Sequence, residues 1–268
     1  MSLVNYDRVI YKKNPLVEVI CQLRFPCILI INEKQPTEFQ EKIRYEFPLY
    51  QTTIEQQQQI VVGGTKGPSQ TSHVLQSEAI NNYRFSSIDE KWHINLTSTF
   101  LALSTSTYNR WEDFIEHFTP PLLALLEIYH PSFYERVGLR YINVFKRSTL
   151  NLADVDWSEL IQPFVLGFIS NSEIKDKVRY QNMSVELDIG NGAWVQVNTS
   201  KNSTGDVGFG FPSIIDEESF VIDFDIFMMR KNIKELDSSL NYLHDYSTKL
   251  IRSIITPKLH NALEPNKL

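Results

Sequence analysis

The stretch ERVGLRYINVF (residues 135–145) alternates between apolar and polar side chains with the two-residue period of a β-strand. Leu139 and Tyr141 fall on one side of this strand, whereas Arg136 and Arg140 fall on the other. A strand with one apolar and one charged side is typical of an antiparallel sheet that is covered on one face only. The stretch therefore predicts such a sheet, and it raises the question of what the two arginines do on the uncovered face.

Several other segments show the same alternation. The predicted strands lie at residues 17–25, 52–62, 82–88, 91–107, 133–145, 178–189, 193–199 and 219–229. Asp89-Glu90 predicts a turn between two of these strands, and Asn191-Gly192 predicts a tight hairpin, because such turns need residues that tolerate positive φ angles. Gly63-Gly64 and Gly67-Pro68 are expected to end the strand at residues 52–62.

Four segments carry apolar residues at the three- and four-residue spacing of amphipathic helices. They lie at residues 36–47, 110–129, 156–168 and 232–256. Pro120-Pro121 should kink or split the second helix, because proline lacks the N–H group that a helix interior needs. Asp156 is expected to open the third helix, and Pro257 to end or bend the fourth. His244 and Asp245 are expected on the polar face of the fourth helix.

The order of these elements predicts an α+β fold. Both halves of the chain follow the order β-α-β-β-β-α, and QLRF (residues 22–25) occupies the place that GLRY (residues 138–141) occupies in the second half. We therefore expect one domain over residues 1–268, built from duplicated units at residues 15–131 and 132–260. Their strands should form a curved antiparallel sheet with the helices on one face. This topology resembles the saddle of the TATA-binding protein and other helix-grip folds, a likeness that carries no functional information.

The apolar sides of the strands should pack against the helices and form the core. The residues expected there are Leu23, Phe25, Leu139, Tyr141, Val185, Leu187, Ile222 and Phe224. Burial of one such side chain stabilises a fold by roughly 1.5–3 kcal/mol. Cys21 and Cys27 lie in or beside an apolar run, and two cysteines are too few for a disulfide framework, so both are expected to be reduced core residues.

By the same alternation, the uncovered face collects polar side chains of both charge signs. The candidate binding residues on it are Arg24, His93, Arg136, Arg140, Glu186, Asp223 and Asp225. One interpretation is a solvated face with weak cross-strand ion pairs. The other is a concave binding surface, on which Arg24 and Arg140 occupy equivalent places in the two repeats and grip a phosphate, a carboxylate or an acidic partner segment. Asn143 has the parity of the core residues, so we expect it at a strand end or in a bulge.

The sequence assigns no catalytic residue, metal or cofactor. Asp223 and Asp225 share a strand face and could hold Mg²⁺, but pairing with Arg136 or Arg140 is favoured. The six histidines show no ligand spacing with one another or with a cysteine, so no zinc site is indicated. No P-loop, GxSxG or GxGxxG motif is present, and GDVGFGFP (residues 205–212) is expected to be a mobile loop.

Charge and hydropathy narrow the class of protein. Residues 1–131 contain 11 Lys+Arg and 14 Asp+Glu, and the remainder contains 15 and 18, so each half carries a net charge of −3. Nucleic-acid-binding proteins are usually basic in at least one region, and this balance disfavours them. The chain has no run of 18 apolar residues, so no membrane span is expected, and its N-terminus has no signal-peptide pattern. These features predict a cytoplasmic protein.

Four stretches together resemble one protein family. They are NPLVEVICQLRFP (residues 14–26), RVGLRYIN (residues 136–143), DFDIF (residues 223–227) and IITPKL (residues 254–259), the last within a long predicted helix. The family is an uncharacterised prokaryotic one that is sporadically distributed among bacteria and archaea, and RxGLRYIN is the most specific of the motifs. The resemblance spans nearly the whole chain. It implies the domain limits and an accessory, mobile or defence-linked gene, and it assigns no activity.

These observations favour a cytosolic binding or adaptor protein over an enzyme. Its open sheet face would recognise a protein partner or an acidic small-molecule ligand. One alternative is a metal-dependent enzyme that acts on a phosphorylated small molecule, although Glu18 stands alone where such enzymes carry paired acidic residues. The other alternative is a nucleic-acid-binding saddle, which the charge of both halves disfavours.

Overall fold

A nine-stranded antiparallel sheet forms the centre of the molecule. The computed structural model describes residues 6–60, 74–202 and 217–267. From one edge of the sheet to the other, the order is β3 (Leu49–Ile60), β4 (Val74–Ser86), β5 (Trp92–Leu96), β6 (Phe100–Thr105), β2 (Leu16–Arg24), β7 (Tyr134–Lys146), β10 (Ser219–Lys231), β9 (Ala193–Asn202) and β8 (Gln181–Gly190). The predicted α+β class with an antiparallel sheet is confirmed.

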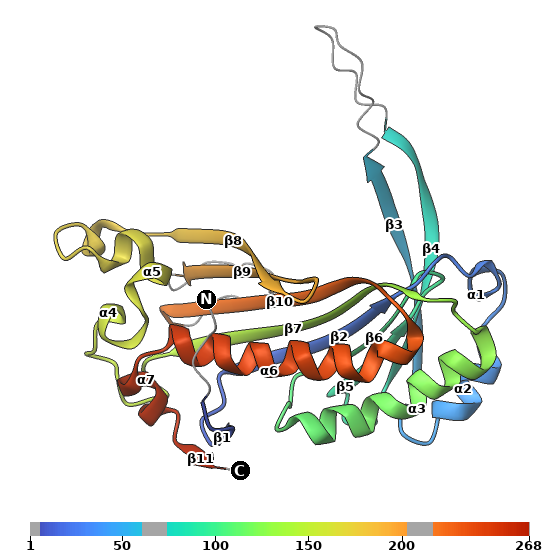
Figure 1. Cartoon of the computed structure of the whole chain (residues 1–268), viewed down its shortest axis with the longest axis horizontal. Coiled ribbons are helices and arrows are strands. Elements are labelled where there is room, and N and C mark those ends of the chain that lie inside the picture. Colours follow the sequence, from blue (N-terminus) through green and yellow to red (C-terminus); the bar gives the residue numbers. More distant parts are fainter. Residues whose placement is uncertain (1–5, 61–73, 203–216, 268) are drawn as a thin grey trace, which may run out of the picture.

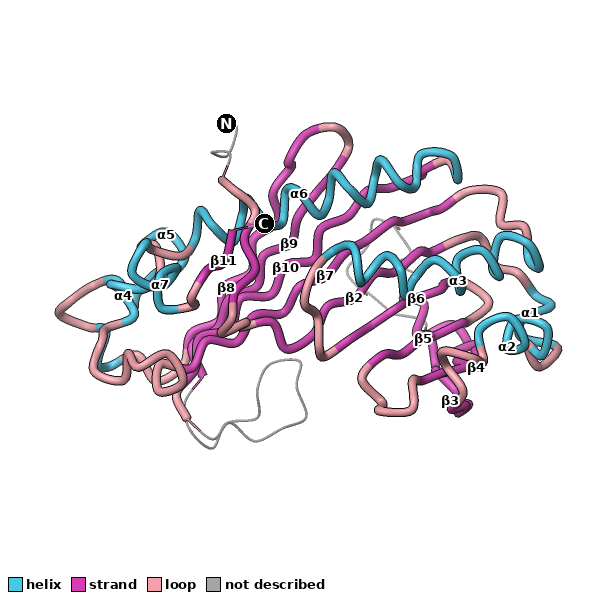
Figure 2. Tube along the Cα trace, turned by 90° about the horizontal axis from the view of Figure 1, so that it is seen from below, coloured by secondary structure: helices cyan, strands magenta, loops and turns pink. Residues whose placement is uncertain are grey.

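The long helices cover one face of this sheet (Figures 1 and 2). α6 (Leu236–Ile254) packs on β7 and β10, α3 (Trp111–Tyr129) packs on β6, and α2 (Thr37–Ile43) lies beside α3. The β3–β4 hairpin rises on the other side of the sheet, away from these helices (Figure 1). Within the described residues, the long helices pack on one face only, and we call the opposite face the open face.

Shorter elements complete the chain. They are α1 (Leu29–Glu33), α4 (Trp157–Leu160), α5 (Pro163–Leu166), α7 (Pro257–Ala262) and the 3₁₀ turns Gly167–Ser170, Lys175–Lys177 and Ile233–Glu235. Near the two ends of the chain, β1 (Val9–Tyr11) pairs with β11 (Pro265–Lys267) in a separate two-stranded sheet. This pairing holds the N-terminal segment against the helix face, and the sequence did not predict it.

Six of the eight expected core residues are buried between the sheet and the helices. Val185 and Leu187 are the exceptions, with exposed fractions of 37% and 40%. Both lie on β8, which is the edge strand beyond β9, whereas α6 packs on β7 and β10. The predicted alternation of β8 is present. Its apolar side stays partly exposed because the strand lies at the sheet edge, beyond the strands that α6 covers.

The segment at residues 91–107 is two strands rather than one. A tight turn at residues 97–99 separates β5 from β6, so four strands, not three, lie between the first two helical regions. The hydroxyl of Thr97 accepts the N–H groups of Thr99 at 3.1 Å and Phe100 at 3.0 Å, and this side chain closes the turn. A threonine turn has no glycine or proline to announce it, which is why the alternation concealed it.

The other turns and helix ends follow local chemistry. The Asn191-Gly192 hairpin is confirmed, with φ angles of 55° and 68°. Asp156 caps α4 as expected, but Pro163 starts a second short helix, so residues 156–168 form two helices. α3 runs through Pro120 and Pro121 without being split. The predicted end of α6 before Pro257 is confirmed, because that proline begins α7.

Two further expectations concern the cysteines and the glycine-rich segments. Both cysteines are free, but only Cys21 is a core residue, since Cys27 is exposed. Gly63-Gly64, Gly67-Pro68 and residues 205–212 lie outside the described residues. No helix in the described part of the chain is long and apolar enough to cross a membrane.

Candidate functional site

Arg140 and Asp223 form a two-pronged ion pair on the open face. The guanidinium of Arg140 donates from Nε to one carboxylate oxygen at 2.9 Å and from Nη2 to the other at 2.8 Å. The Asp223 side chain is only 7% exposed, so its charge needs such a partner to remain stable in the interior. Asp223 in turn raises the pKa of Arg140 through this hydrogen bond.

Arg136 reaches Asp225 by lying flat over a glycine. Its Nη2 donates to the Asp225 carboxylate at 2.5 Å, and its guanidinium lies 4.5 Å from the centre of the Phe227 ring. A Cβ atom on Gly138 would stand 2.3 Å from Nη1 of Arg136. Because Gly138 has no side chain, the side chain of Arg136 can lie over it and cross from β7 to β10.

The R-x-G-x-R and D-x-D motifs thus form one interlocking pattern. Both arginines lean in the same direction along β7, since Arg140 stands opposite Asp225 in the register yet pairs with Asp223. The expected pairing of these aspartates with arginines is confirmed. Within the described residues, no three His, Cys, Asp or Glu side chains gather closely enough to hold a metal ion.

Arg24 lies beside this pattern and differs from it. It stands directly opposite Arg136 on the neighbouring strand β2, with its side chain half-buried. On its other side, β6 presents Phe100 rather than a carboxylate. In the described part of the chain, no carboxylate forms an ion pair with Arg24, nor with Arg84 on β4.

Glu18 and His93 are the titratable neighbours of these arginines. Burial raises the pKa of Glu18, while the charges of Arg140 and Arg84 act in the opposite direction. His93 shares a 2.8 Å hydrogen bond with the Ser86 hydroxyl through Nδ1. Burial and the charge of Arg84 lower the pKa of His93, which favours the neutral ring. Among the residues described on this part of the open face, arginines therefore outnumber carboxylates, although the chain as a whole carries a net charge of −6.

The remaining predicted residues lie apart from this centre. Glu186 is exposed on the edge strand β8, opposite Gln196, and β9 separates it from β10. Asn143 is in the interior of β7 rather than at its end, and it is buried on the helix side, where its amide donates to the Ile222 carbonyl at 3.2 Å. The expected irregularity is on the neighbouring strand, because β2 shifts its register between Leu16 and Glu18 beside Asn143.

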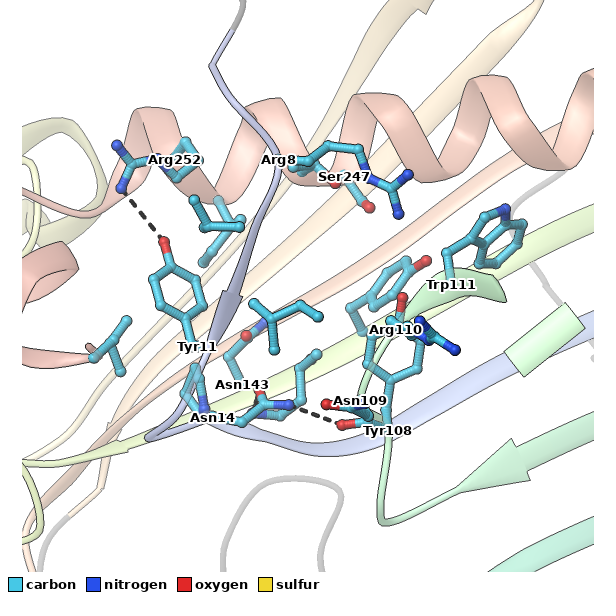
Figure 3. Close-up of a pocket in the computed structure, with 18 of the residues that line it drawn as sticks. Arg8, Tyr11, Asn14, Tyr108, Asn109, Arg110, Trp111, Asn143, Ser247 and Arg252 are labelled. Atoms are coloured by element: carbon cyan, nitrogen blue, oxygen red, sulfur yellow. Dashed lines mark hydrogen bonds between the residues drawn. The ribbon is translucent and has the colours of Figure 1, made fainter. Parts of the chain in front are cut away.

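A second candidate site lies on the helix face, between α6 and the beginning of α3 (Figure 3). It holds about 840 Å³ of empty space, including the part open to solvent, and the N-terminal segment crosses it. We call it the helix-side cavity. Its lining includes aromatic residues from five elements or connections, namely Tyr11, Tyr108, Trp111, Tyr141 and Phe224.

His244 is the central polar group of the helix-side cavity. Its ring stacks on Trp111 with centroids 4.5 Å apart, and its Nδ1 shares a 3.0 Å hydrogen bond with the Tyr141 hydroxyl. Burial lowers the pKa of His244 to about 4, and the nearby Arg8 adds to this effect. The imidazole is therefore neutral at physiological pH. Burial also raises the pKa of Tyr141 and of Tyr108, so both phenols keep their protons.

The prediction that His244 lies on the polar helix face is wrong. The residue is 8% exposed, and it belongs to the buried stripe of α6 together with Leu240 and Ser247. These positions are four and three residues away from it, which is the spacing of one helix face. That spacing was the available signal, and the polar character of histidine concealed it.

Comparison with models of known protein families and with curated proteins finds no match to this chain. The fold and the two candidate sites therefore carry the functional argument.

Proposed function

We propose that this chain is a binding or adaptor protein, not an enzyme, and that its open face recognises an acidic segment of a partner protein. The observation that carries the proposal is Arg24. It is a half-buried arginine that faces Arg136 across the strand pair, and in the described residues it has no carboxylate partner. Like charges placed directly opposite on neighbouring strands destabilise a sheet, and a bound carboxylate would relieve the repulsion.

We propose that the chain arose by duplication. Arg24 and Arg140 are then equivalent residues of the two halves, and they differ in that only Arg140 has kept a carboxylate partner. The strand order β6-β2-β7-β10 is symmetric about the central β2–β7 pair, and α3 and α6 each contain 19 residues. Gln22 stands opposite Gly138 in the register, so Arg24 and Arg140 are each two residues beyond this point on their own strands. Arg140 has Asp225 opposite it on β10, whereas Arg24 has Phe100 opposite it on β6. The first half thus keeps the arginine without its carboxylate.

The test compares what co-purifies with the wild-type chain and with Arg24→Glu from extracts of the source cells. Arg44→Glu is the matched control, because Arg44 is an exposed arginine at the C-terminal end of α2 that forms a local ion pair with Glu41. Proteins and small molecules in each eluate are identified by mass spectrometry. A partner retained by the control and lost from Arg24→Glu supports the proposal, and identical eluates from all three chains contradict it.

Arg140 is an unsuitable probe for this purpose. Its replacement would leave Asp223 buried without a counter-charge, which typically costs about 3–5 kcal/mol. Loss of binding in such a variant would report unfolding rather than recognition.

The metal-dependent enzyme remains an alternative that the same protein can test. Thermal unfolding is measured with Mg²⁺ or Mn²⁺ together with tripolyphosphate. A ligand present at 100 times its Kd should stabilise the fold by about 2.7 kcal/mol. A shift of this size that Arg24→Glu abolishes would replace the adaptor proposal with a phosphate-binding site on the same face.

A further inference from the structure

We propose that the helix-side cavity binds a small organic carboxylate with an aromatic or aliphatic body. The site lies on the opposite side of the sheet from the open face and is independent of the function proposed above.

The cavity walls offer an apolar surface because their polar groups already bond to one another. Asn14 donates to the Tyr108 carbonyl and accepts from the Leu16 amide. Ser247 and Thr248 both donate to the His244 carbonyl, at 2.7 Å and 3.2 Å. With these groups engaged, the lining presents mainly aromatic rings and aliphatic carbon. Such a surface suits an apolar body better than a sugar, which would need several free donors and acceptors.

The arginines of the cavity differ in their counter-charges. Arg8 pairs with Glu112 and Arg110 pairs with Asp113, so both charges are neutralised at the rim. Arg252 has no carboxylate partner in the described part of the chain. Its Nη1 donates to the Tyr11 hydroxyl at 3.3 Å, and its Nε is buried with no hydrogen-bond acceptor. Because no described carboxylate neutralises Arg252, its guanidinium is suited to a carboxylate, which can accept two parallel hydrogen bonds from it.

The two ends of the cavity set the length of the ligand. Figure 3 shows Arg252 and Tyr11 at one side and Trp111 at the other, with Arg8 and Ser247 between them. His244, which stacks on Trp111, precedes Arg252 by eight residues on α6. At a rise of 1.5 Å per residue, this separation is roughly 12 Å. A carboxylate at Arg252 with its apolar end against Trp111 and His244 therefore spans a chain of several carbons and a ring.

The probes are the ω-phenyl carboxylates from phenylacetate to 6-phenylhexanoate, titrated calorimetrically into the full chain. We expect binding to be strongest for an intermediate length, and the amide and the amine of that compound to bind at least ten-fold more weakly. Arg252→Gln should reduce affinity for the acid at least ten-fold and leave affinity for the amide unchanged. Arg44→Gln, far from the cavity, is the matched control and should bind like the wild type.

A cavity-filling variant separates the body from the head group. Thr248→Leu, on the partly exposed wall of the cavity, should weaken the binding of acid and amide alike. Thermal unfolding of this variant is measured alongside to check that it folds. Absence of binding by every acid at 10 mM, or equal binding of acid, amide and amine, would overturn the proposal. Unchanged binding of the acid by Arg252→Gln would overturn the assignment of the carboxylate to that end.

Discussion

Gly138 is the residue on which the ion pairs of the open face depend. A Cβ atom there would stand 2.3 Å from the Arg136 guanidinium, which would have to leave Asp225 and Phe227. We expect Gly138→Ala to lower the free energy of unfolding by about 1 kcal/mol, the size of one partly exposed charged hydrogen bond. Urea denaturation measures the change.

The matched control is the same substitution in an Arg136→Ala background. With the guanidinium gone, alanine meets no obstacle, and its cost should vanish or become a small gain because alanine restricts the unfolded chain. An equal cost in both backgrounds would show that the glycine is needed for its backbone rather than for the arginine.

His244 should make the stability of the protein depend on pH. Its pKa is about 4 in the folded state, and that of an unfolded histidine is about 6.5, so the unfolded chain binds a proton first as the pH falls. Stability from this residue is complete above pH 6.5 and is lost toward pH 4. Between pH 7.5 and pH 5.0 the expected loss is about 2 kcal/mol.

Urea denaturation at these two pH values tests the assignment. His244→Phe keeps a ring against Trp111 but cannot titrate, so its loss between the two pH values should be about 2 kcal/mol smaller than that of the wild type. The groups that face His244, namely Tyr141, Arg8 and Glu112, are unchanged in this comparison. An identical pH dependence in both proteins would mean that another group is responsible.

At the residue scale, the alternation of apolar and polar residues predicted which side chains share a face of the sheet, but not the geometry of their contacts. It put Arg136, Arg140, Asp223 and Asp225 together and favoured their pairing, as the structure confirms. It could not give the diagonal lean of the arginines, which depends on the register between β7 and β10. The helix-side cavity could not be predicted from the sequence, because it is formed by the N-terminal segment, α3 and α6 together, which are far apart along the chain.

At the scale of elements, the edge strand β8 and its neighbour β9 should respond differently to the same change. Val185 and Val197 stand opposite each other in the register, but Val185 is 37% exposed and Val197 is 5% exposed. We expect Val197→Ala to destabilise the fold by about 2 kcal/mol and Val185→Ala by less than about 1 kcal/mol. Urea denaturation of the two variants measures this directly. Equal costs would show that Val185 is covered in solution.

The elements that the sequence predicted best are those with a local cause. The hairpin at Asn191-Gly192 needs positive φ angles that these two residues supply, and α4 begins where Asp156 can cap it. The turn at Thr97 escaped prediction because its hydroxyl replaces the usual turn residues. The exposure of β8 escaped because strand order, not local sequence, decides which strand lies at the edge.

For the whole molecule, one sheet and one core join the two halves. β2 of the first half pairs with β7 of the second, and one cluster of buried side chains contains residues of both. Trp111 in α3 also contacts α6 directly, since it stacks on His244 and its indole N–H donates to Asn241 at 3.1 Å. Because the buried core is made of side chains from both halves, neither half has a complete core by itself.

We therefore expect the halves to unfold together, and the tryptophans allow a test. Trp92 contacts His117 and Phe114 in the first half, whereas Trp157 contacts Phe220 in the second. Two variants each keep one of these tryptophans and carry phenylalanine at the other three positions. Within each variant, the urea transition followed by fluorescence should coincide with the transition followed by far-ultraviolet circular dichroism, because a single cooperative unit loses all its structure at once.

Removal of Trp111 weakens the contact between α3 and α6, so it biases the experiment toward separation of the halves. Coincident curves in both variants would then be strong support for one folding unit, and a fluorescence transition that precedes the dichroism transition in only one variant would show that this half unfolds on its own.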